Sequence, residues 1–262
     1  MASKKKGSEN YMLRFVSIYN ENYMAKYGAL SESLIEAFLK TPRHNFLPKE
    51  YVYQGSKVDD ILKTGDFTFN GHRYTSFQTQ PSFVLLMLHL LKLDEGEIHN
   101  ILEIGSGCGW VCEMLAYFSR KIVGSEIFED LCSFSRETLK SHNIDNVEIV
   151  KAEPEVFGNK GKGPYDRIIA SCAIHIKELS KILVQLNPDG IAVIPITIKS
   201  LLDCSAFKKE NVPYFEARAK EHEGACILTQ YSLGYDKGGL FSRPKPKLFS
   251  KCTEGCAFVS GL

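Results

Sequence analysis

Residues 101–110 read Ile-Leu-Glu-Ile-Gly-Ser-Gly-Cys-Gly-Trp, an apolar run followed by a loop with glycine at every second position. The run at 101–104 predicts a buried strand, and residues 111–118 predict a helix. Gly105, Gly107 and Gly109 carry no side chains, so a ligand can approach the backbone of the loop closely. This stretch therefore predicts a ligand-binding turn between a strand and a helix.

An acidic residue ends the next apolar run. Residues 121–125 predict a second strand, and Glu126 follows it, 23 residues after Glu103. A carboxylate at this place can accept hydrogen bonds from both hydroxyls of a ribose. The two acids favour a bound ligand, and a glycine-rich turn without a ligand is the alternative.

The spacing of the glycines helps to separate two classes of cofactor. A dinucleotide site has the pattern G-x-G-x-x-G, whereas this chain has G-x-G-x-G preceded by Glu103. A carboxylate here would repel a pyrophosphate but suits a cationic ligand, such as the amino group and sulfonium of S-adenosylmethionine. We therefore expect S-adenosylmethionine rather than NAD as the cofactor.

Length and charge narrow the class of protein. A chain of 262 residues can bury a full core, and a formal net charge of +1 argues against nucleic-acid binding driven by bulk charge. The longest apolar stretch, residues 83–93, contains His89 and Lys92 and is too short to span a bilayer. We find no secretory signal, and we expect residues 1–10 to be a disordered basic tail.

The eight cysteines are scattered through predicted helices and strands, which favours a reducing cytosol over a disulfide framework. Cys252-x-x-x-Cys256 has neither the spacing nor the second pair of a zinc site, so we expect no metal. Cys108 fits the loop as a small residue rather than as a nucleophile. We expect a cytoplasmic monomer.

Predicted helices and strands alternate along the chain. We expect helices over 31–40, from Pro81 onward, over 128–143 and over 176–186, and strands over 147–151, 165–170 and 191–196. Ser33 and Glu36 predict a capping box, residues 187–190 predict a turn, and the prolines at 244 and 246 predict a loop over 242–247.

This alternation predicts an α/β fold, a Rossmann-like doubly wound and mostly parallel sheet with helices on both faces. No linker divides the chain, so we expect one domain over 11–262. Within it, 199–224 is expected to be an insertion and 225–262 a C-terminal extension with short strands over 226–235 and 257–259.

Several segments together carry a family resemblance. They are Thr41-Pro42-Arg43-His44-Asn45-Phe46-Leu47-Pro48, Thr79-Gln80-Pro81, the glycine loop, residues 163–170 and residues 185–196. About residues 30 to 198 resemble the protein-L-isoaspartate O-methyltransferase family, and the P-R-H-x-F-x-P segment is the most specific part. The resemblance implies a class I methyltransferase that moves a methyl group from S-adenosylmethionine to the carboxylate of an L-isoaspartyl residue, the first step of protein repair.

The resemblance also implies roles for individual residues. The donor is expected to contact a set of residues in and after the glycine loop: Glu103, Gly105, Ser106, Gly107, Cys108, Gly109, Glu126, Ile127 and Glu153. In the family, a serine near the helix at Pro81 lies beside donor and acceptor. Thr79 stands there in this chain, so we expect Thr79 to be the catalytic residue that orients the acceptor. A plain helix N-cap is its alternative role.

This chain departs from the family pattern at several places. Gln78 replaces an apolar residue, and the threonine at 79 adds a methyl group to the site. Glu153 stands where the family has an aspartate, and it is expected to contact the adenine amino group with a longer side chain; a surface glutamate is the alternative. His175 replaces part of a small-residue run, and a helix cap competes with a role in proton transfer.

These departures leave three hypotheses open. The first is an isoaspartyl methyltransferase that acts on damaged proteins or peptides. The second is a methyltransferase of the same fold for another acceptor carboxylate, and the third is a non-catalytic adaptor that retains the donor pocket. Under the first hypothesis the partners are proteins or peptides that bear isoaspartyl residues, with no membrane and no nucleic acid involved.

Overall fold

The computed structural model describes residues 2–49, 52, 59–69, 71–153, 155–203, 225–236 and 245–257. In these residues, a seven-stranded sheet has the order β5-β4-β3-β6-β7-β8-β9. Its strands are β3 (Asn100–Ile104), β4 (Lys121–Glu126), β5 (Val147–Lys151), β6 (Tyr165–Ala170), β7 (Leu186–Thr197), β8 (Ala225–Asp236) and β9 (Lys245–Ala257). The strands from β5 to β7 in this order pair in parallel, whereas β8 pairs antiparallel with β7 and β9 pairs antiparallel with β8.

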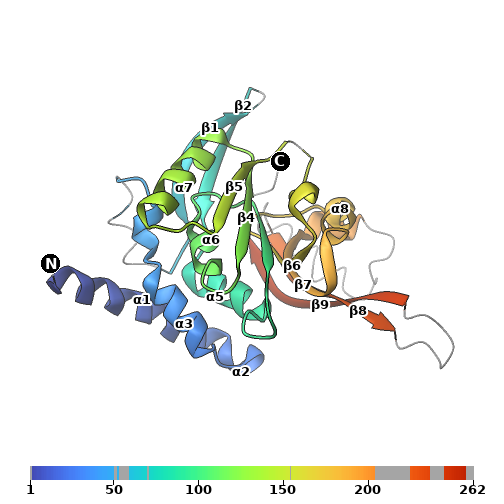
Figure 1. Cartoon of the computed structure of the whole chain (residues 1–262), viewed down its shortest axis with the longest axis horizontal. Coiled ribbons are helices and arrows are strands. Elements are labelled where there is room, and N and C mark those ends of the chain that lie inside the picture. Colours follow the sequence, from blue (N-terminus) through green and yellow to red (C-terminus); the bar gives the residue numbers. More distant parts are fainter. Residues whose placement is uncertain are drawn as a thin grey trace.

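Helices cover both faces of this sheet (Figure 1). One face packs against α5 (Pro81–Leu90), α6 (Trp110–Leu115) and α7 (Glu129–Ser141). The other face packs against α8 (Leu179–Leu183) and the short turn η3 (Ile176–Glu178), and a second short turn, η2 (Lys160–Lys162), precedes β6. Neighbouring strand residues alternate between the faces: Ile101 belongs to the first buried cluster and Leu102 to the second. The doubly wound, mostly parallel α/β fold is therefore confirmed.

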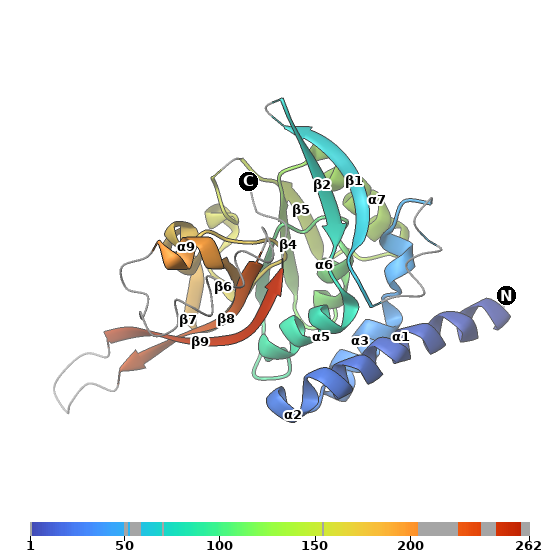
Figure 2. The same ribbon diagram turned by 180° about the vertical axis from the view of Figure 1, so that it is seen from behind.

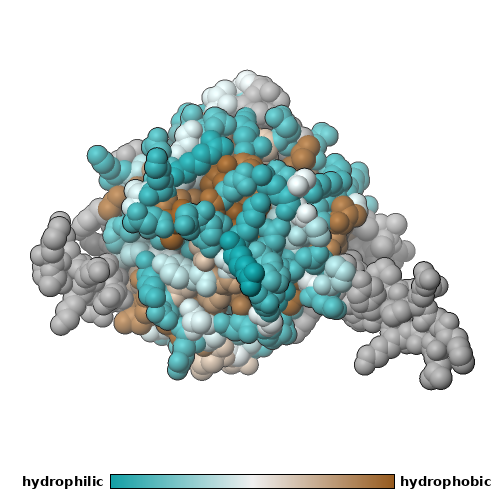
Figure 3. Space-filling model, viewed as in Figure 1, coloured by the Kyte–Doolittle hydropathy of each residue, from teal (hydrophilic) through white to brown (hydrophobic). Residues whose placement is uncertain are grey.

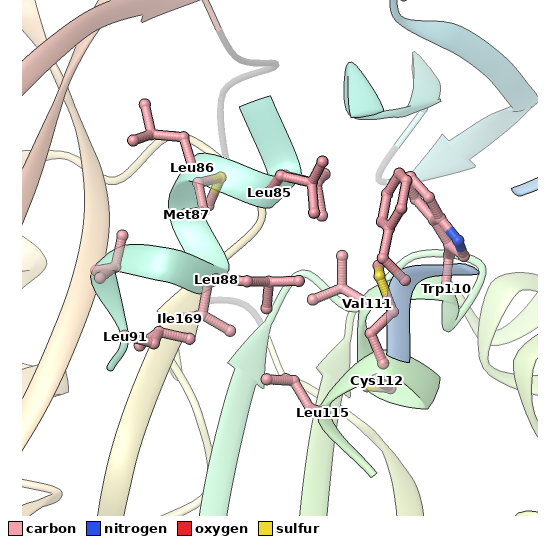
Figure 4. Close-up of a cluster of buried hydrophobic side chains, with 14 of the residues drawn as sticks. Leu85, Leu86, Met87, Leu88, Leu91, Trp110, Val111, Cys112, Leu115 and Ile169 are labelled. Carbon is pink, nitrogen blue, oxygen red and sulfur yellow. The ribbon is translucent and has the colours of Figure 1, made fainter. Parts of the chain in front are cut away.

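Two helices form the apolar layer that supports the glycine loop. Figure 4 shows Leu85 and Leu88 of α5 near Val111 and Leu115 of α6, above the strands. All four side chains are buried. Because α6 begins directly after the glycine loop, this packing fixes the position of the loop over the sheet.

A separate two-stranded sheet precedes α5 and was not predicted. It consists of β1 (Leu62–Phe69) and β2 (His72–Gln78), and it rises beyond the carboxyl ends of β4 and β5 (Figure 2). The sequence carried its signal, because Asn70-Gly71 between alternating apolar and polar residues is a strong indicator of a hairpin. The ring of Phe67 stacks on that of Phe128, with centroids 4.8 Å apart, and so joins the hairpin to the main body.

The N-terminal part of the chain is helical where a disordered tail was expected. Helix α1 runs over Ala2–Asn22 and is followed by α2 (Met24–Tyr27), α3 (Glu32–Lys40) and the 3-10 turn η1 (Arg43–Phe46). The reason lies after residue 10, where Met12, Phe15 and Tyr19 are buried at helical spacing in the main core. A helix anchored by this apolar face extends back through residues 2–10.

Two local expectations need correction. The capping box at Ser33 is wrong: Ser31 is the N-cap of α3 and its hydroxyl accepts from the Leu34 amide at 3.3 Å, whereas Ser33 bonds to Asp94. The turn at residues 187–190 lies inside β7, where the register with β6 shifts and Asp189 has a φ of 62°. These residues do adopt a turn-like backbone, but they form an irregularity within a strand rather than a connection between two elements.

The C-terminal part completes the main sheet. Strand β8 confirms the strand expected at 226–235, and β9 includes Pro246, where a loop was expected. Since β9 is the last strand of the sheet, it tolerates a proline that an inner strand would exclude. Of the expected insertion at 199–224, residues 199–202 lie in α9 (Ile198–Leu202) and residues 204–224 lie outside the described residues, as do 258 and 259 of the expected last strand.

The order of the strands places a site at one edge of the sheet. The chain passes from β3 outward to β4 and β5, then returns to the other side of β3 with β6. At such a reversal the loops that follow the two central strands diverge and leave a crevice at their carboxyl ends. Within the described residues, none of the helices combines the length and apolar character needed to cross a membrane.

Candidate active site

A cavity of about 330 Å³ occupies this crevice, between the carboxyl ends of β3, β4 and β6 and the strand β2. On the face seen in Figure 3, hydrophilic residues surround several separate apolar areas, one of them in the upper middle of the view. Six of the sequence-predicted site residues line the cavity: Thr79, Gly105, Gly107, Glu126, Ile127 and Glu153. The structure therefore brings the expected acceptor residue and part of the expected donor set to one place.

The glycine loop forms one side of the cavity. Gly105 and Gly107 have φ values of 73° and 53°, which side-chain-bearing residues rarely adopt. A Cβ atom on Gly105 would lie 3.0 Å from Cys172 Sγ, so the space beside Gly105 is already filled on that side. At Gly107 a Cβ would meet nothing within 4 Å, which leaves the backbone open to a ligand.

Glu126 fixes the loop and faces the cavity at the end of β4. Its carboxylate accepts from the amides of Gly107 at 2.8 Å, Ile127 at 2.8 Å and Phe128 at 3.0 Å. The side chain is only 5% exposed, and burial raises its pKa while these three amides act in the opposite direction. A carboxylate already oriented by the backbone can accept further hydrogen bonds from ligand hydroxyls without rearranging.

Four of the expected donor residues do not line the cavity: Glu103, Ser106, Cys108 and Gly109. Glu103 is 1% exposed, and its carboxylate accepts from Cys112 Sγ at 2.8 Å and Ser171 Oγ at 2.6 Å. Gly109 lies over Ser135 of α7. These residues support the loop from behind, so direct contact with a donor stays a prediction for them.

The burial of Glu103 predicts how stability depends on pH. Desolvation raises its pKa from 4.5 to about 8, so the folded state holds a proton that the unfolded state releases. This contribution to stability is fully present below pH 4.5 and is lost as the pH rises toward 8. We expect the free energy of unfolding, measured with urea, to fall over this range in the native chain and to fall less in Glu103→Gln. Parallel curves for the two chains would contradict this role of Glu103.

The acceptor side of the cavity comes from β2 and the segment after it. Thr79 lines the cavity, and its alternative role as a helix cap is wrong, because Gln80 is the N-cap of α5 and Asp59 accepts from the Ser82 amide. This wall also contains four lining residues that were not predicted from the sequence: Tyr74, Thr75, Ser76 and Phe77. The hairpin signal at Asn70-Gly71 would have placed them on a strand leading to Thr79.

The charge of the cavity favours a cation. Three carboxylates line it, from Glu126, Glu153 and Glu155, and the described lining residues include no lysine, arginine or histidine. His175 lies outside the lining and caps η3, where its Nδ1 accepts from the Lys177 amide at 3.2 Å. The capping alternative for His175 is therefore the one that the structure supports.

The P-R-H-x-F-x-P segment holds three parts of the molecule together. The Arg43 side chain bonds to Gln78 and to backbone carbonyls near Thr79. His44 Nδ1 lies 3.0 Å from the hydroxyl of Tyr11 on α1, and the Phe46 ring packs edge-on against His142 after α7. The segment is thus a structural junction that joins α1, the residues before α5 and the end of α7.

The sheet order, the glycine turn and the acid that ends the next strand together define the Rossmann-like methyltransferase fold. A more specific assignment comes from comparison with known sequences. The family model described as Protein-L-isoaspartate(D-aspartate) O-methyltransferase matches residues 21–229. The chain therefore belongs to this family.

Individual relatives agree with this membership. The chain is 36% identical over 171 residues to a protein-L-isoaspartate O-methyltransferase of Methanosarcina mazei, covering 64% of this chain and 65% of the relative. It is 34% identical over 174 residues to protein-L-isoaspartate O-methyltransferase 2 of Archaeoglobus fulgidus, covering 64% and 72%. The matched part thus spans slightly less than two thirds of the Methanosarcina protein.

Solved structures show the same fold. A Plasmodium falciparum chain described as a protein-L-isoaspartate O-methyltransferase, solved in complex with S-adenosyl-L-homocysteine, has a TM-score of 0.58 at 18% identity. That match covers 97% of both chains. Another structure named protein-L-isoaspartate O-methyltransferase has a TM-score of 0.65 at 21% identity, covering 95% of this chain and 65% of the other.

Proposed function

We propose that this chain is an S-adenosylmethionine-dependent carboxyl methyltransferase that acts on L-isoaspartyl residues of damaged proteins or peptides. Family membership supports the reaction, and one observation on the site carries the proposal. Thr79, two glycines of the loop and Glu126 line the same cavity, and the lining holds three carboxylates and no described basic side chain. This combination suits a cationic donor and a hydroxyl-guided acceptor in one space.

Five of the nine expected donor residues line the cavity, and their chemistry suits S-adenosylmethionine. Bound S-adenosylmethionine supplies a methyl group activated on a positively charged sulfur. Glu126 would hold the ribose hydroxyls, Gly105 and Gly107 would present backbone to the donor, and Glu153 would accept from the adenine amino group. Ile127, next to Glu126, supplies an apolar side chain to the same wall.

The acceptor half needs orientation rather than a strong base. An isoaspartyl carboxylate is already ionised at neutral pH, so its oxygen can attack without losing a proton. Thr79 Oγ1 would donate a hydrogen bond to this carboxylate and leave its charge in place. Tyr74 and Phe77 on β2 also line the cavity, and with an acceptor bound they would help to exclude water from the attacking oxygen.

The most direct test uses two peptides that differ only at one residue. Purified chain is incubated with S-adenosylmethionine labelled in the methyl group and with an isoaspartyl peptide or its aspartyl twin. Base-labile label on the isoaspartyl peptide alone is the expected result. Label on neither peptide, together with measurable binding of S-adenosyl-L-homocysteine, would contradict the proposal.

Removing the Thr79 hydroxyl is expected to slow catalysis without weakening the donor site. Thr79→Val keeps the shape of the side chain, so we expect kcat to fall about 10- to 100-fold while the Kd for S-adenosyl-L-homocysteine changes little. Thr79→Ser restores the hydroxyl and should keep most of the activity. Initial rates and calorimetric titration measure both quantities, and unchanged kcat in Thr79→Val would remove Thr79 from the site.

A second acceptor is favoured by two residues of this chain. Thr79 carries a methyl group that a serine lacks, and Gln78 introduces an amide next to it. Thr79 changes the cavity lining itself, whereas Gln78 lies behind the lining and is bonded to Arg43 and Cys108. These differences support a methyltransferase for another carboxylate as the second candidate function. Transfer of label to the aspartyl peptide or to small carboxylic acids, but not to the isoaspartyl peptide, would favour it.

We also propose that the chain works as a cytoplasmic monomer, with protein or peptide substrates as its partners. Five cysteines among the described side chains are free, which agrees with a reducing compartment. Size-exclusion chromatography with light scattering would test the monomer, and a mass of two chains would overturn it.

A further inference from the structure

We propose that Arg43 is the positioning residue of the acceptor site, acting on the Thr79 hydroxyl through the backbone of residues 78 and 79. The inference rests on the proposed function, because Thr79 matters to catalysis only if it meets the acceptor. Arg43 itself is not among the residues that line the cavity. Its effect must therefore pass through the groups that it holds.

The guanidinium of Arg43 forms three hydrogen bonds to residues 78 and 79, which we call the acceptor segment. Its Nε donates to Gln78 Oε1 at 2.6 Å, and its Nη2 lies 3.2 Å from the carbonyl oxygens of both Gln78 and Thr79. Nη2 also donates to the Asp60 carbonyl at 2.7 Å, at the base of the hairpin. A planar guanidinium that makes several bonds at once holds its partners in a fixed arrangement, which a flexible ammonium group does not.

The burial of this contact makes it rigid. Arg43 is 0% exposed and Gln78 is 4% exposed, so neither side chain can exchange its bonds for water. Burial lowers the pKa of Arg43 to about 10, which leaves the guanidinium charged at neutral pH. The bonds to the acceptor segment are therefore charge-assisted and persistent.

The same arginine also contacts the donor side. Gln78 Nε2 donates to Cys108 Sγ at 3.3 Å, and Cys108 belongs to the glycine loop. The Arg43 guanidinium lies 5.7 Å from the centroid of the Trp110 ring, the first residue of α6. One buried side chain thus connects the segment that carries Thr79 with the loop that borders the donor cavity.

This connection has a direct chemical consequence. Methyl transfer requires the attacking oxygen, the methyl carbon and the sulfur to lie in line, and an error of about 1 Å can cost 100-fold in rate. Thr79 orients the acceptor and the glycine loop orients the donor, and Arg43 fixes the one relative to the other. Loss of the Arg43 guanidinium and its hydrogen bonds should reduce kcat more than it reduces the affinity for the donor.

The chain offers a matched control for this test in Arg167. It is also buried, and its guanidinium donates to the backbone carbonyls of Leu91 at 2.7 Å and Glu95 at 2.9 Å. It lies outside the cavity lining, on β6 and before the carboxyl end of that strand. Arg43→Lys and Arg167→Lys therefore each remove a buried guanidinium that makes several hydrogen bonds. The first bonds to residues 78 and 79, and the second bonds to the segment after α5.

The first experiment compares kcat in five chains: the native chain, Arg43→Lys, Arg167→Lys, Thr79→Val and the double variant of Thr79→Val with Arg43→Lys. We expect Arg43→Lys to lose about 10- to 100-fold in kcat, with a Kd for S-adenosyl-L-homocysteine within about threefold of the native value. Arg167→Lys should lose thermal stability but keep kcat. When Thr79→Val is already present, Arg43→Lys should reduce kcat little further, because Arg43 is proposed to act through the Thr79 hydroxyl that this variant lacks. Equal losses in the two arginine variants, or additive losses in the double variant, would overturn the inference.

A second experiment does not depend on catalysis. Hydrogen exchange is measured at the amides of residues 78–80 with and without S-adenosyl-L-homocysteine. The ligand should slow this exchange in the native chain and in Arg167→Lys but not in Arg43→Lys. The same slowing in Arg43→Lys, or none in the native chain, would show that Arg43 does not connect the two sides. A native chain that transfers no methyl group contradicts the proposed function instead, and the exchange result still decides this inference.

Discussion

Glu126→Ala is expected to weaken the binding of S-adenosyl-L-homocysteine about 30- to 100-fold. The substitution removes the acceptor that the ribose hydroxyls would use and releases the amides of Gly107, Ile127 and Phe128 from their common partner. Loss of hydrogen bonds to a charged group costs about 2 to 3 kcal/mol in total, which corresponds to this range of affinity. Isothermal titration with S-adenosyl-L-homocysteine measures the change directly.

The control for this variant is an acid close by in the sequence. Glu129 begins α7, is exposed, and forms an ion pair with Arg136 at 2.9 Å. Glu129→Ala removes the same charge without touching the cavity, so its Kd should stay near the native value. If both variants bound the ligand as the native chain does, Glu126 would have no part in the donor site.

Gly124→Val is expected to cause the largest loss of stability, about 3 kcal/mol. Gly124 lies in the middle of β4, paired with Glu103 of β3. A Cβ atom there would lie 2.6 Å from Ile149 Cδ1 and 2.7 Å from Cys112 Sγ, closer than van der Waals contact allows. The side chains of Ile149 and Cys112 would have to shift, which disturbs the packing of α6 on the sheet. Urea denaturation monitored by circular dichroism should report a lower midpoint.

A second glycine separates crowding from the general effect of a side chain. Gly161 lies in the η2 turn, where an added Cβ would meet only Asn159 at 3.5 Å, an ordinary contact. Gly161→Ala should therefore unfold within about 0.5 kcal/mol of the native chain. A native-like midpoint in Gly124→Val would mean that the side chains around Gly124 can make room without cost.

The central strands could be predicted because their apolar runs are bounded by turn residues. The runs before Gly105 and through Glu126 became β3 and β4 within one residue of the expected limits. Helix α5 was equally clear from Pro81 and its apolar face. These signals are local, so one sequence is enough to carry them.

The acceptor wall was missed for two different reasons. The hairpin of β1 and β2 left a signal at Asn70-Gly71 that was available in the sequence. The contact between Arg43 and Gln78 joins residues 35 positions apart and has no local pattern. Only the folded chain reveals that the family-specific arginine reaches the residue beside Thr79.

Four of the expected donor residues are not among the residues that line the cavity. Glu103 was expected to face a cation. In the structure it lies on the inner strand β3, and its carboxylate accepts hydrogen bonds from Cys112 and Ser171. A motif gives the order of residues along the loop, but not which side chains turn inward. Gly107 and Glu126, by contrast, were placed correctly at the cavity because each follows a strand that ends there.

The hairpin of β1 and β2 forms its own two-stranded sheet, and the stacking of Phe67 on Phe128 helps to join it to the rest of the molecule. Every backbone bond of the seven-stranded sheet would survive if a hairpin of the same length from another member of the family replaced it. Under the proposed function, the part expected to contact the acceptor can thus change as a module, while the part expected to hold the donor stays the same. Such a division lets one scaffold acquire new methyl acceptors through changes in a short, contiguous piece of the gene.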